Sequence, residues 1–379
     1  MCENPPMSGE FAYEPGRTLP APWYTDPEWL ERENDRIFER SWQFVGWLGK
    51  LEVPGSFLAT TVGRIPVVVV RGDDGELRAL VNVCRHRGSE LVGDAEGRRK
   101  TLQCRYHAWT YNLDGSLRKA PRLDDSESAD PELTLERLRL ETVGPFVFVS
   151  ADPETESLST LAAAWPPLLA ESGVDHAHLV PRESRTYDVQ ANWKILAENF
   201  LECYHCPVSH HGFSRLIDLD TYAGKVHSDV FWHFRSTARA AAVKANTAGI
   251  ADLPPERRDL WNFVVWPNFM ANIYPGAGNI STNRLVPLAA DRTLAIYDFY
   301  FEASATEEQA RENVEFVDTV QQEDIALCES VQRGLRSRRI ERGRFIDNEV
   351  FLDRFVWEVA RHLTDDELAA PVLPETLTL

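Results

Sequence analysis

The hydrophobic pattern changes twice along the chain and divides it into three stretches. Residues 1–25 are rich in proline and show no regular period. Asp26 and Pro27 then suit a helix start, because aspartate favours the N-cap and proline the first helical position. The apolar residues that follow recur on one helical face: Leu30, Ile37, Phe38 and Trp42. We therefore predict an arm and a helix of about four turns over residues 1–43, packed on the C-terminal part of the chain.

Between residues 44 and 150 the pattern becomes that of short β-strands. Apolar runs alternate with tight turns, and Asp-Gly pairs separate them at Asp74-Gly75 and Asp114-Gly115. Asp-Gly suits the positive φ angles of hairpin turns. A small antiparallel β domain is therefore predicted over residues 44–150.

Helices and strands mix over residues 151–379. The segment ANWKILAENFLECYH has helical character and should end just before Pro207, which cannot continue a helix. Three runs have strand character: FVVWPNFMANIY, ISTNRLVPL and TLAIYDFYFEA. A long helix is expected over 306–339, opened by a capping box of Thr306 and Gln309. The tail APVLPETLTL is expected to be loosely held.

Composition and charge narrow the class of protein. The chain has 379 residues, of which 43% are hydrophobic, and a formal net charge of −19. Such a length predicts about two to three domains and a core that needs no disulfides. The apolar content excludes a wholly disordered chain, and the acidity excludes duplex nucleic acid as the main partner. The acidity favours cationic or neutral ligands, although a solvated acidic surface is its commoner meaning.

The first thirty residues lack a basic and apolar signal segment, and no apolar run is long enough to cross a membrane. Six cysteines in a long chain without a signal do not predict a disulfide framework. A cytoplasmic protein with reduced or metal-bound thiols is expected.

Two short motifs of the β domain carry metal-ligand residues. They are Cys84-x-His86 and Cys104-x-x-His107. Zinc accepts two cysteines and two histidines, but a zinc finger normally keeps each residue type together. A Rieske [2Fe–2S] cluster needs two thiolates on one iron and two imidazoles on the other, which suits one Cys and one His per loop. Taken one at a time, these residues are more typical of buried free cysteines and core histidines, and it is the group of four at this spacing that indicates a metal centre.

A second group of ligands lies around the break at Pro207. Glu202 and His205 are three residues apart and would share a helix face, and His210 follows the break. Two histidines and one carboxylate form the facial triad of non-haem Fe(II) oxygenases. Glu202 could be the third ligand, and His211 could replace His210, but a later acid is the better candidate for the carboxylate.

That later acid is Asp324 on the long C-terminal helix. An apolar seam is predicted there from five residues: Val317, Val320, Leu327, Val331 and Leu335. Asp324 falls within the seam, whereas its neighbour Glu323 should point further toward solvent. A buried carboxylate is costly unless it is paired or bound to metal. A ferrous ion would supply the partner, and a core arginine is the alternative.

A CxxC pair, Cys203 and Cys206, lies in the segment with His205. Such a pair is typical of redox sites at the start of a thioredoxin-like helix. Because this pair lies at a helix end instead, two packing cysteines are expected.

Together these motifs resemble the catalytic α subunit of Rieske non-haem iron ring-hydroxylating oxygenases. The pieces that carry the resemblance are CRHRG, CRYHAW, NWK and ENFLECYH followed by x4-His, and it spans about Trp42 to Leu335. WPN, IYPGAGN and QQEDIALCESVQRGL look like the branch of choline, glycine-betaine and carnitine monooxygenases. The resemblance implies an α+β fold: an all-β Rieske domain and a helix-grip catalytic domain, an antiparallel sheet around a long C-terminal helix.

The resemblance also implies the role of each motif residue. Cys84 and Cys104 would bind one cluster iron, and His86 and His107 the other. The mononuclear Fe(II) ligands would be His205, His210 and Asp324, with the x4 spacing selecting His210. Many members have Asp at the position of Glu202, and a Glu there looks like the betaine/carnitine branch. This residue would bridge His205 to the Rieske histidine His107 of the next subunit. A homotrimer, with or without small β subunits, and a flavin/iron-sulfur reductase that passes on NAD(P)H electrons would follow.

The substrate is predicted from an aromatic stretch, 222–274. Aromatic side chains can form a cage for a quaternary ammonium group or line a slot for an arene. The residues expected in such a pocket are Trp232, Phe263, Trp266 and Tyr274. Hydroxylation, and potentially N-demethylation, of a small quaternary ammonium or methylamine substrate with O2 is expected. The alternatives are arene hydroxylation, a Rieske electron carrier without oxygenase activity, and a zinc-binding regulatory protein.

Overall fold

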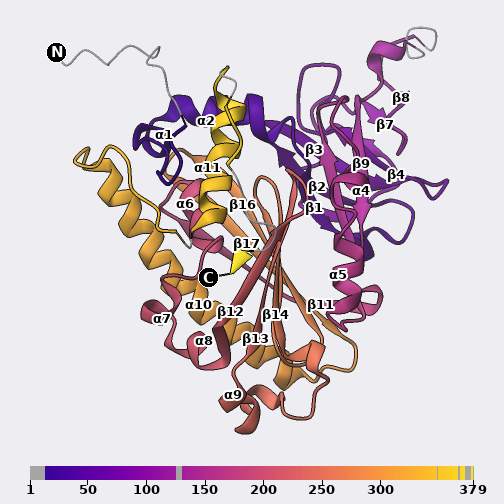
Figure 1. The fold of residues 1–379 in the computed structure, drawn as a ribbon. Helices are drawn as coiled ribbons and strands as arrows, with labels where there is room; N and C mark the ends of the chain where they lie inside the picture. Colours follow the sequence, from indigo (N-terminus) through magenta and orange to yellow (C-terminus); the bar gives the residue numbers. More distant parts are fainter. Residues whose placement is uncertain (1–12, 125–129, 348, 366–367, 372–376, 379) are drawn as a thin grey trace.

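The structure is a computed structural model, and it describes residues 13–378 except 125–129, 348, 366–367 and 372–376 (Figure 1). Two large antiparallel sheets, one from each half of the chain, dominate the described part. No helix within that part combines the length and apolar character that a membrane crossing needs. The α+β class with an all-β domain and a helix-covered sheet is confirmed.

The N-terminal sheet has seven strands. In spatial order they are β1 (Gln43–Trp47), β10 (Phe146–Ser150), β9 (Arg137–Val143), β4 (Leu77–Val81), β3 (Ile65–Arg71), β2 (Ser56–Val62) and β5 (Glu96–Arg98). A smaller sheet contains β6 (Leu102–Gln103), β7 (Thr110–Tyr111) and β8 (Leu117–Lys119). Both predicted Asp-Gly turns are confirmed: Gly75 between β3 and β4 and Gly115 between β7 and β8 have φ angles of +82° and +93°.

The C-terminal sheet has eight strands. Their spatial order is β11 (Leu179–Val189), β17 (Arg292–Glu302), β16 (Asn279–Ala289), β15 (Phe269–Ile273), β14 (Asp259–Val265), β13 (Phe231–Ala238), β12 (Ile217–Val226) and β18 (Leu377–Thr378). Strand β18 pairs with Ala223 and Gly224 of β12. This end of the tail is therefore not loosely held as predicted, while its residues 372–376 and 379 lie outside the described part.

The helices cluster around the second sheet. They are α1 (Pro22–Thr25), α2 (Pro27–Glu33), α4 (Leu158–Leu161), α5 (Trp165–Glu171), α6 (Trp193–Phe200), α7 (Cys206–Ser209), α8 (His211–Leu216), α9 (Ala240–Lys244), α10 (Glu307–Arg336) and α11 (Val350–Leu363). A π-helical turn η1 (Asn34–Phe38) extends α2, and 3₁₀ turns lie at η2 (Leu48–Leu51), η3 (Pro131–Leu133), η4 (His176–His178), η5 (Thr247–Gly249) and η6 (Pro255–Arg258). The predicted capping box of Thr306 and Gln309 opens α10.

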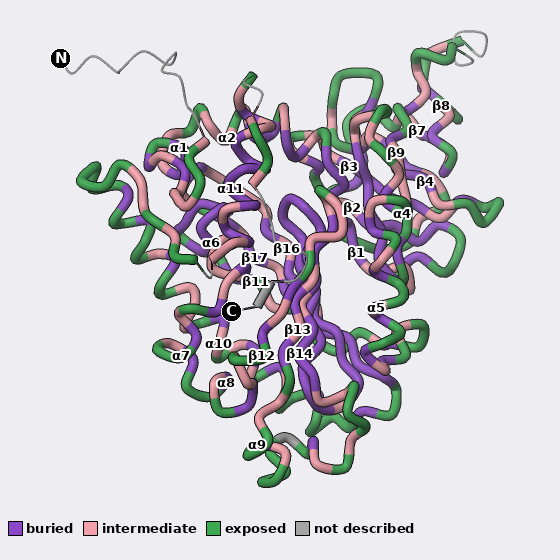
Figure 2. Tube along the Cα trace, viewed as in Figure 1, coloured by how far each residue is buried: buried purple, intermediate pink, exposed green. Residues whose placement is uncertain are grey.

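Each face of the C-terminal sheet has its own core, and long parts of the strands around β13 and β14 are coloured as buried (Figure 2). One face packs against α6, α10 and α11. The other packs against α5 and against Phe44, Phe146 and Phe148 of the N-terminal sheet. Because side chains alternate along a strand, Leu260 and Val264 of β14 face the helices, while Phe263 between them faces the N-terminal sheet. Any site between α10 and the sheet must therefore be lined, on each strand, by the alternate residues that face the helices.

Two helix predictions are corrected. Helix α6 ends at Phe200 rather than just before Pro207, because Pro207 occupies the first turn of a new short helix, α7. On α10, Leu327 and Val331 are exposed, at 36% and 49%, and do not belong to the seam. The buried residues of α10 are Ala310, Val314, Val317, Gln321, Cys328, Gln332 and Leu335. Two glutamines replace the expected apolar residues because each finds hydrogen-bond partners within the core.

Candidate functional site

The two Cys-His motifs of the β domain form a pair of matching loops. The backbone of Gly88 donates to the carbonyl of Cys84 (3.0 Å), and the backbone of Ala108 donates to that of Cys104 (3.1 Å). Gly88 and Ala108 both have positive φ angles, +71° and +59°. In each loop, the backbone N–H of the residue four positions after the cysteine therefore donates to the carbonyl of that cysteine. Both loops need a residue at this position that adopts the left-handed region of φ.

The loops sort their ligand residues by depth. Cys84 and Cys104 are both 2% exposed, whereas His86 and His107 are exposed, with ring centroids 4.6 Å apart. Although burial raises the pKa of Cys104, hydrogen bonds from the backbones of Tyr106 and His107 lower it on balance, which favours the thiolate. Two inner thiolates and two outer imidazoles are the donor set that a Rieske cluster would need.

Aromatic rings fix the orientation of the outer imidazoles. His86 stacks on Trp109 with centroids 4.9 Å apart, and His107 stacks on Tyr106 at 3.9 Å. Tyr111 lies below, with its hydroxyl 3.4 Å from the Cys84 sulfur. The side chain of Tyr106 is 58% exposed, so an aromatic ring covers one flank of His107 and meets solvent on its other side.

The second predicted group converges between α6, α7 and α10. His210 Nε2 lies 3.1 Å from His205 Nε2 and 2.9 Å from Asp324 Oδ1, and His205 Nε2 lies 3.3 Å from the same oxygen. Two imidazole nitrogens and one carboxylate oxygen therefore point at one place. This is the donor set of the facial triad of non-haem Fe(II) enzymes.

A further layer of carboxylates and amides holds these three donors. The Nδ1 atom of His205 is hydrogen-bonded to Glu202, and that of His210 to Glu323 at 2.7 Å. Asn199 donates to Asp324 Oδ1 at 3.1 Å. Carboxylates on the outer nitrogens leave both Nε2 atoms as metal donors. The side chain of Glu323 is 40% exposed against 16% for Asp324, so it lies further toward solvent as predicted, but its carboxylate reaches back to His210.

The charges around the triad suit a cation. Burial lowers the pKa of His205, but hydrogen bonds to Asp324 and Glu202 outweigh burial and raise that pKa to about 9. The pKa of His210 is raised in the same way against its burial, by Asp324 and Glu323. Burial raises the pKa of Asp324, yet its hydrogen bonds to both histidines lower it overall. Asp324 bonds to the histidines and Asn199, so within the described residues no core arginine pairs with it.

The loop between α6 and α7 positions Glu202 and His205 without the shared helix face predicted for them. The Glu202 carboxylate accepts hydrogen bonds from the backbones of Tyr204 and His205, which folds the loop around it. Cys203 and Cys206 form a disulfide, so the prediction of two packing thiols is wrong.

A sulfur also lies beside the triad, since the ligand atoms of His205, Cys206 and His210 are all within 4.8 Å of one another. The disulfide removes the thiolate that Cys206 would need to bind a metal, whereas Asp324 Oδ1 lies free of such a bond beside both histidine nitrogens. His210 is 2% exposed, whereas His211 is exposed, so the geometry selects His210.

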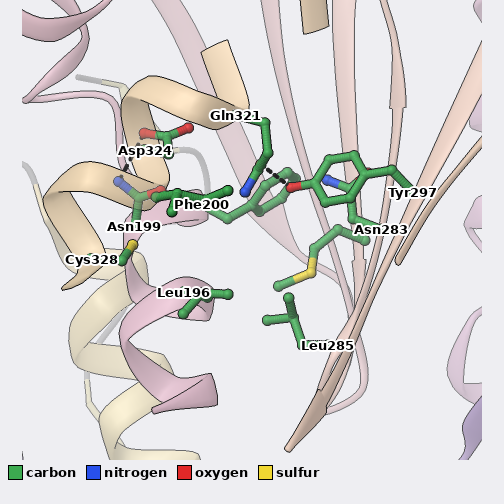
Figure 3. Close-up of a pocket in the computed structure, with 11 residues that line it drawn as sticks. Leu196, Asn199, Phe200, Asn283, Leu285, Tyr297, Gln321, Asp324 and Cys328 are labelled. Atoms are coloured by element: carbon green, nitrogen blue, oxygen red, sulfur yellow. Dashed lines mark hydrogen bonds between the residues drawn. The ribbon is translucent and has the colours of Figure 1, made fainter. Parts of the chain in front are cut away.

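A cavity adjoins the triad between α6, α10 and the sheet (Figure 3). Its aromatic lining residues are Phe200, Phe213, Tyr222, Tyr274 and Tyr297. Of the four aromatic residues predicted for the pocket, Tyr274 is in this lining. Trp232 and Trp266 lie in the core on the helix side, and Phe263 lies on the opposite face of the sheet. Successive residues of a strand point to opposite faces of the sheet. The prediction from the aromatic richness of residues 222–274 did not take this alternation into account.

Polar residues of the cavity were also missed by the sequence reasoning. They are Asn199, Asn262, Asn272, Asn283 and Gln321. The three strand asparagines occupy inward positions, between apolar residues that face the helices, and this alternation is visible in the sequence once the inward parity of each strand is known.

Comparison with known proteins assigns the chain to a family. Residues 41–136 match the Rieske [2Fe-2S] domain family, and residues 176–365 match the family "Ring hydroxylating alpha subunit (catalytic domain)". The chloroplastic choline monooxygenase of Arabidopsis thaliana is 33% identical over 348 residues, which cover 88% of this chain and 79% of that protein. The carnitine monooxygenase oxygenase subunit of Acinetobacter pittii is 32% identical over 339 residues, which cover 89% of this chain and 88% of that protein.

Solved structures agree with this assignment. The quaternary ammonium Rieske monooxygenase CntA in complex with L-carnitine superposes with a TM-score of 0.79 and 30% identity, covering 92% of this chain and 96% of that one. A Rhodococcus naphthalene 1,2-dioxygenase shares the fold at a TM-score of 0.76 and 19% identity, covering 91% and 94%. With both donor sets in place, the chain belongs to the Rieske non-haem iron ring-hydroxylating oxygenases and is a catalytic α subunit that uses a [2Fe–2S] cluster and non-haem iron.

Proposed function

We propose that this chain is the oxygenase component of a system that hydroxylates a small quaternary ammonium or methylamine compound with O2, and that hydroxylation can lead to N-demethylation. The observation that carries the proposal is the aromatic cavity, which opens directly onto the convergent nitrogens of His205 and His210 and the carboxylate of Asp324. Aromatic faces and carboxylates both attract a methylated ammonium group. The naming of similar proteins as choline and carnitine monooxygenases supports the same substrate class.

Each donor residue has one role in this proposal. Cys84 and Cys104 would hold the inner iron of the cluster, and His86 and His107 the outer one. His205, His210 and Asp324 would hold the mononuclear iron. When bound, these metals supply electron transfer and activation of O2. The chain's own contribution is to orient both imidazoles through Glu202 and Glu323, to anchor Asp324 through Asn199, and to hold the substrate in the cavity beside them.

Electron delivery would require a second subunit. The cluster loops and the α7 segment lie far apart in one chain (Figure 1). Tyr106 beside His107 and Tyr204 beside His205 are 58% and 62% exposed, as expected for surfaces that another copy covers. A homotrimer in which His107 of the partner subunit hydrogen-bonds to Glu202 would join the two centres. A flavin/iron-sulfur reductase would supply NAD(P)H electrons. A cytoplasmic location would suit both the oxygenase and this reductase.

The bridge is tested by Glu202→Gln. The variant should keep the visible spectrum of the cluster and the iron content but slow the electron transfer that follows mixing of the reduced protein with substrate and O2. Wild-type transfer rates in this variant would refute the bridge.

A three-part chain, with an arm over 1–43, a Rieske domain over 44–150 and a catalytic domain over 151–379, fits the same scheme.

Substrate class is tested by a panel with a competent reductase, reading product by mass spectrometry rather than consumption of NADH. Trimethylammonium compounds should yield oxygenated or demethylated product. Product from arenes together with none from any trimethylammonium compound would overturn the proposal.

A further inference from the structure

An amide ladder crosses the floor of the cavity. Asn262 of β14 donates from Nδ2 to Asn272 Oδ1 of β15 at 2.7 Å. Asn272 in turn donates to Asn283 Oδ1 and to Ser281 Oγ of β16, each at 3.4 Å. All of these residues are on the helix-facing side of the sheet, and Asn272 and Asn283 are 1% and 3% exposed.

The ladder has a direction, and it ends in a donor. Along the ladder each asparagine donates from its amide nitrogen to the amide oxygen of the next. Asn283 is the last asparagine, so its Nδ2 group has no hydrogen-bond partner among the described residues. Asn283 is nearly buried, so this amide donor can meet a partner only in the cavity that the residue lines. Asn283 lines both the deep part of the cavity and the part beside the triad, so this donor is placed where a ligand would meet it (Figure 3).

A second donor faces the same space from α10. The hydroxyl of Tyr297 donates to Gln321 Oε1, and burial holds the pKa of Tyr297 well above its usual range, so the hydroxyl keeps its proton. The Nε2 group of Gln321 is therefore left over in the same way as Asn283 Nδ2. Asn283 on the sheet and Gln321 on the helix both line the narrow space in which Asp324 also lies.

The charge of the lining decides which acceptor fits. Every lysine and arginine of the chain lies within the described residues, and none of them lines the cavity. Its charged side chains besides the two histidines are the carboxylates Glu202 and Asp324. A substrate carboxylate would find no lysine or arginine to pair with and would lie near two like charges, because both histidines are already paired with carboxylates of the chain. A hydroxyl or carbonyl oxygen would satisfy both amide donors without that cost.

From these observations we infer that Asn283 and Gln321 are specificity-determining residues, which select methylated ammonium substrates whose far end is an uncharged oxygen and reject those that end in a carboxylate. This inference rests on the proposed function and narrows it. The aromatic part of the cavity, with Tyr222 and Tyr274, would take the ammonium group, and the two amides would take the oxygen. The known carnitine-bound relative shows that the family also accepts carboxylates, so the selection belongs to this chain's own lining.

Four probes separate the contributions of charge and hydrogen bonding: choline, its isostere n-propyltrimethylammonium without the hydroxyl, glycine betaine and L-carnitine. Binding is measured by isothermal titration calorimetry without reductase, and kcat/KM from product. We expect choline to exceed both carboxylates by at least about 100-fold in kcat/KM. We also expect it to exceed the isostere by about 10-fold or more in affinity.

Variants locate the effect. Asn283→Leu keeps about the size of the side chain and removes the free donor without adding a charge, and Gln321→Leu removes the other donor. Each should cut choline binding by about 10-fold while leaving binding of the isostere unchanged. Gln322→Leu, the exposed neighbour on α10, is the matched control and should behave like the wild type. Cluster spectra and thermal unfolding show that each variant is folded.

The outcomes are distinct. Equal use of carboxylate and hydroxyl substrates, or equal losses for choline and the isostere in both variants, would overturn the inference and leave the proposed function standing. No binding or product with any of the four probes would overturn the proposed function as well.

Discussion

The carboxylate of Glu323, which is hydrogen-bonded to the Nδ1 atom of His210, gives the sharpest prediction about the mononuclear site. His210 is 2% exposed, and its Nδ1 atom is 2.7 Å from the Glu323 carboxylate. Glu323→Ala would leave this nitrogen without its partner and free the ring to rotate. A charge-assisted hydrogen bond contributes about 1.5–3 kcal/mol, and the 40% exposure of Glu323 moves the estimate to the lower part of that range. Loss of such a partner typically weakens metal binding by about 10- to 100-fold.

The assay is competition for Fe(II) with a chelator of graded strength, followed by measurement of retained iron and of the cluster absorbance. Glu323→Ala should lose mononuclear iron at a lower chelator concentration, with the cluster unchanged. Glu323→Gln keeps a hydrogen-bond acceptor, so the chelator concentration at which it loses iron should lie between those of Glu323→Ala and the wild type. Glu312→Ala, an exposed position nearer the start of α10, serves as the control. Retention of iron equal to that of the wild type in Glu323→Ala would refute the role given to this carboxylate.

Three further changes test other parts of the structure. Asp324→Ala should abolish product formation while leaving the cluster spectrum intact, and preserved turnover would exclude Asp324 as a ligand. Lys194→Met should destabilise the fold by about 3–5 kcal/mol in urea unfolding, because it strands the fully buried carboxylate of Glu33; the double variant with Glu33→Gln should recover most of the loss, and no recovery would argue against the pair. Burial raises the pKa of Glu198 from 4.5 to about 7. The folded state therefore holds this proton more tightly than the unfolded state, and stability falls as pH rises from 4.5 through 7, by about 3 kcal/mol in all. Glu198→Gln should flatten that fall, and an unchanged profile would assign it to other groups.

The sequence predicted both metal centres because ligand chemistry restricts residue types more than it restricts position. Cys84-x-His86 with Cys104-x-x-His107 leaves few alternatives to a Rieske donor set, whatever the exact loop geometry. His205, His210 and Asp324 were assembled from a helix break and one polar residue in an apolar stripe, and the structure brings their donor atoms within 3.3 Å. The antiparallel strands of the second half were likewise visible in their alternation.

What escaped prediction depends on contacts between elements. The short distance from Glu323 to His210 could not be inferred from α10 alone, where adjacent residues point about 100° apart. Strand parity placed Phe263 on the far face of the sheet, away from the cavity. The disulfide of Cys203 and Cys206 and the end of α6 at Phe200 follow from a loop folded around the Glu202 carboxylate. Each of these depends on tertiary geometry that a one-dimensional pattern does not contain.

A single-turnover experiment decides whether this chain inserts oxygen or only carries electrons. Protein with a reduced cluster and a loaded ferrous site is mixed, without reductase, with choline and O2. We expect oxidised or demethylated product, measured by mass spectrometry, in an amount that matches the cluster reoxidised, from protein with about three iron atoms per chain. Reoxidation of the cluster without any product, in protein with about two iron atoms per chain, would identify an electron carrier and contradict the oxygenase assignment.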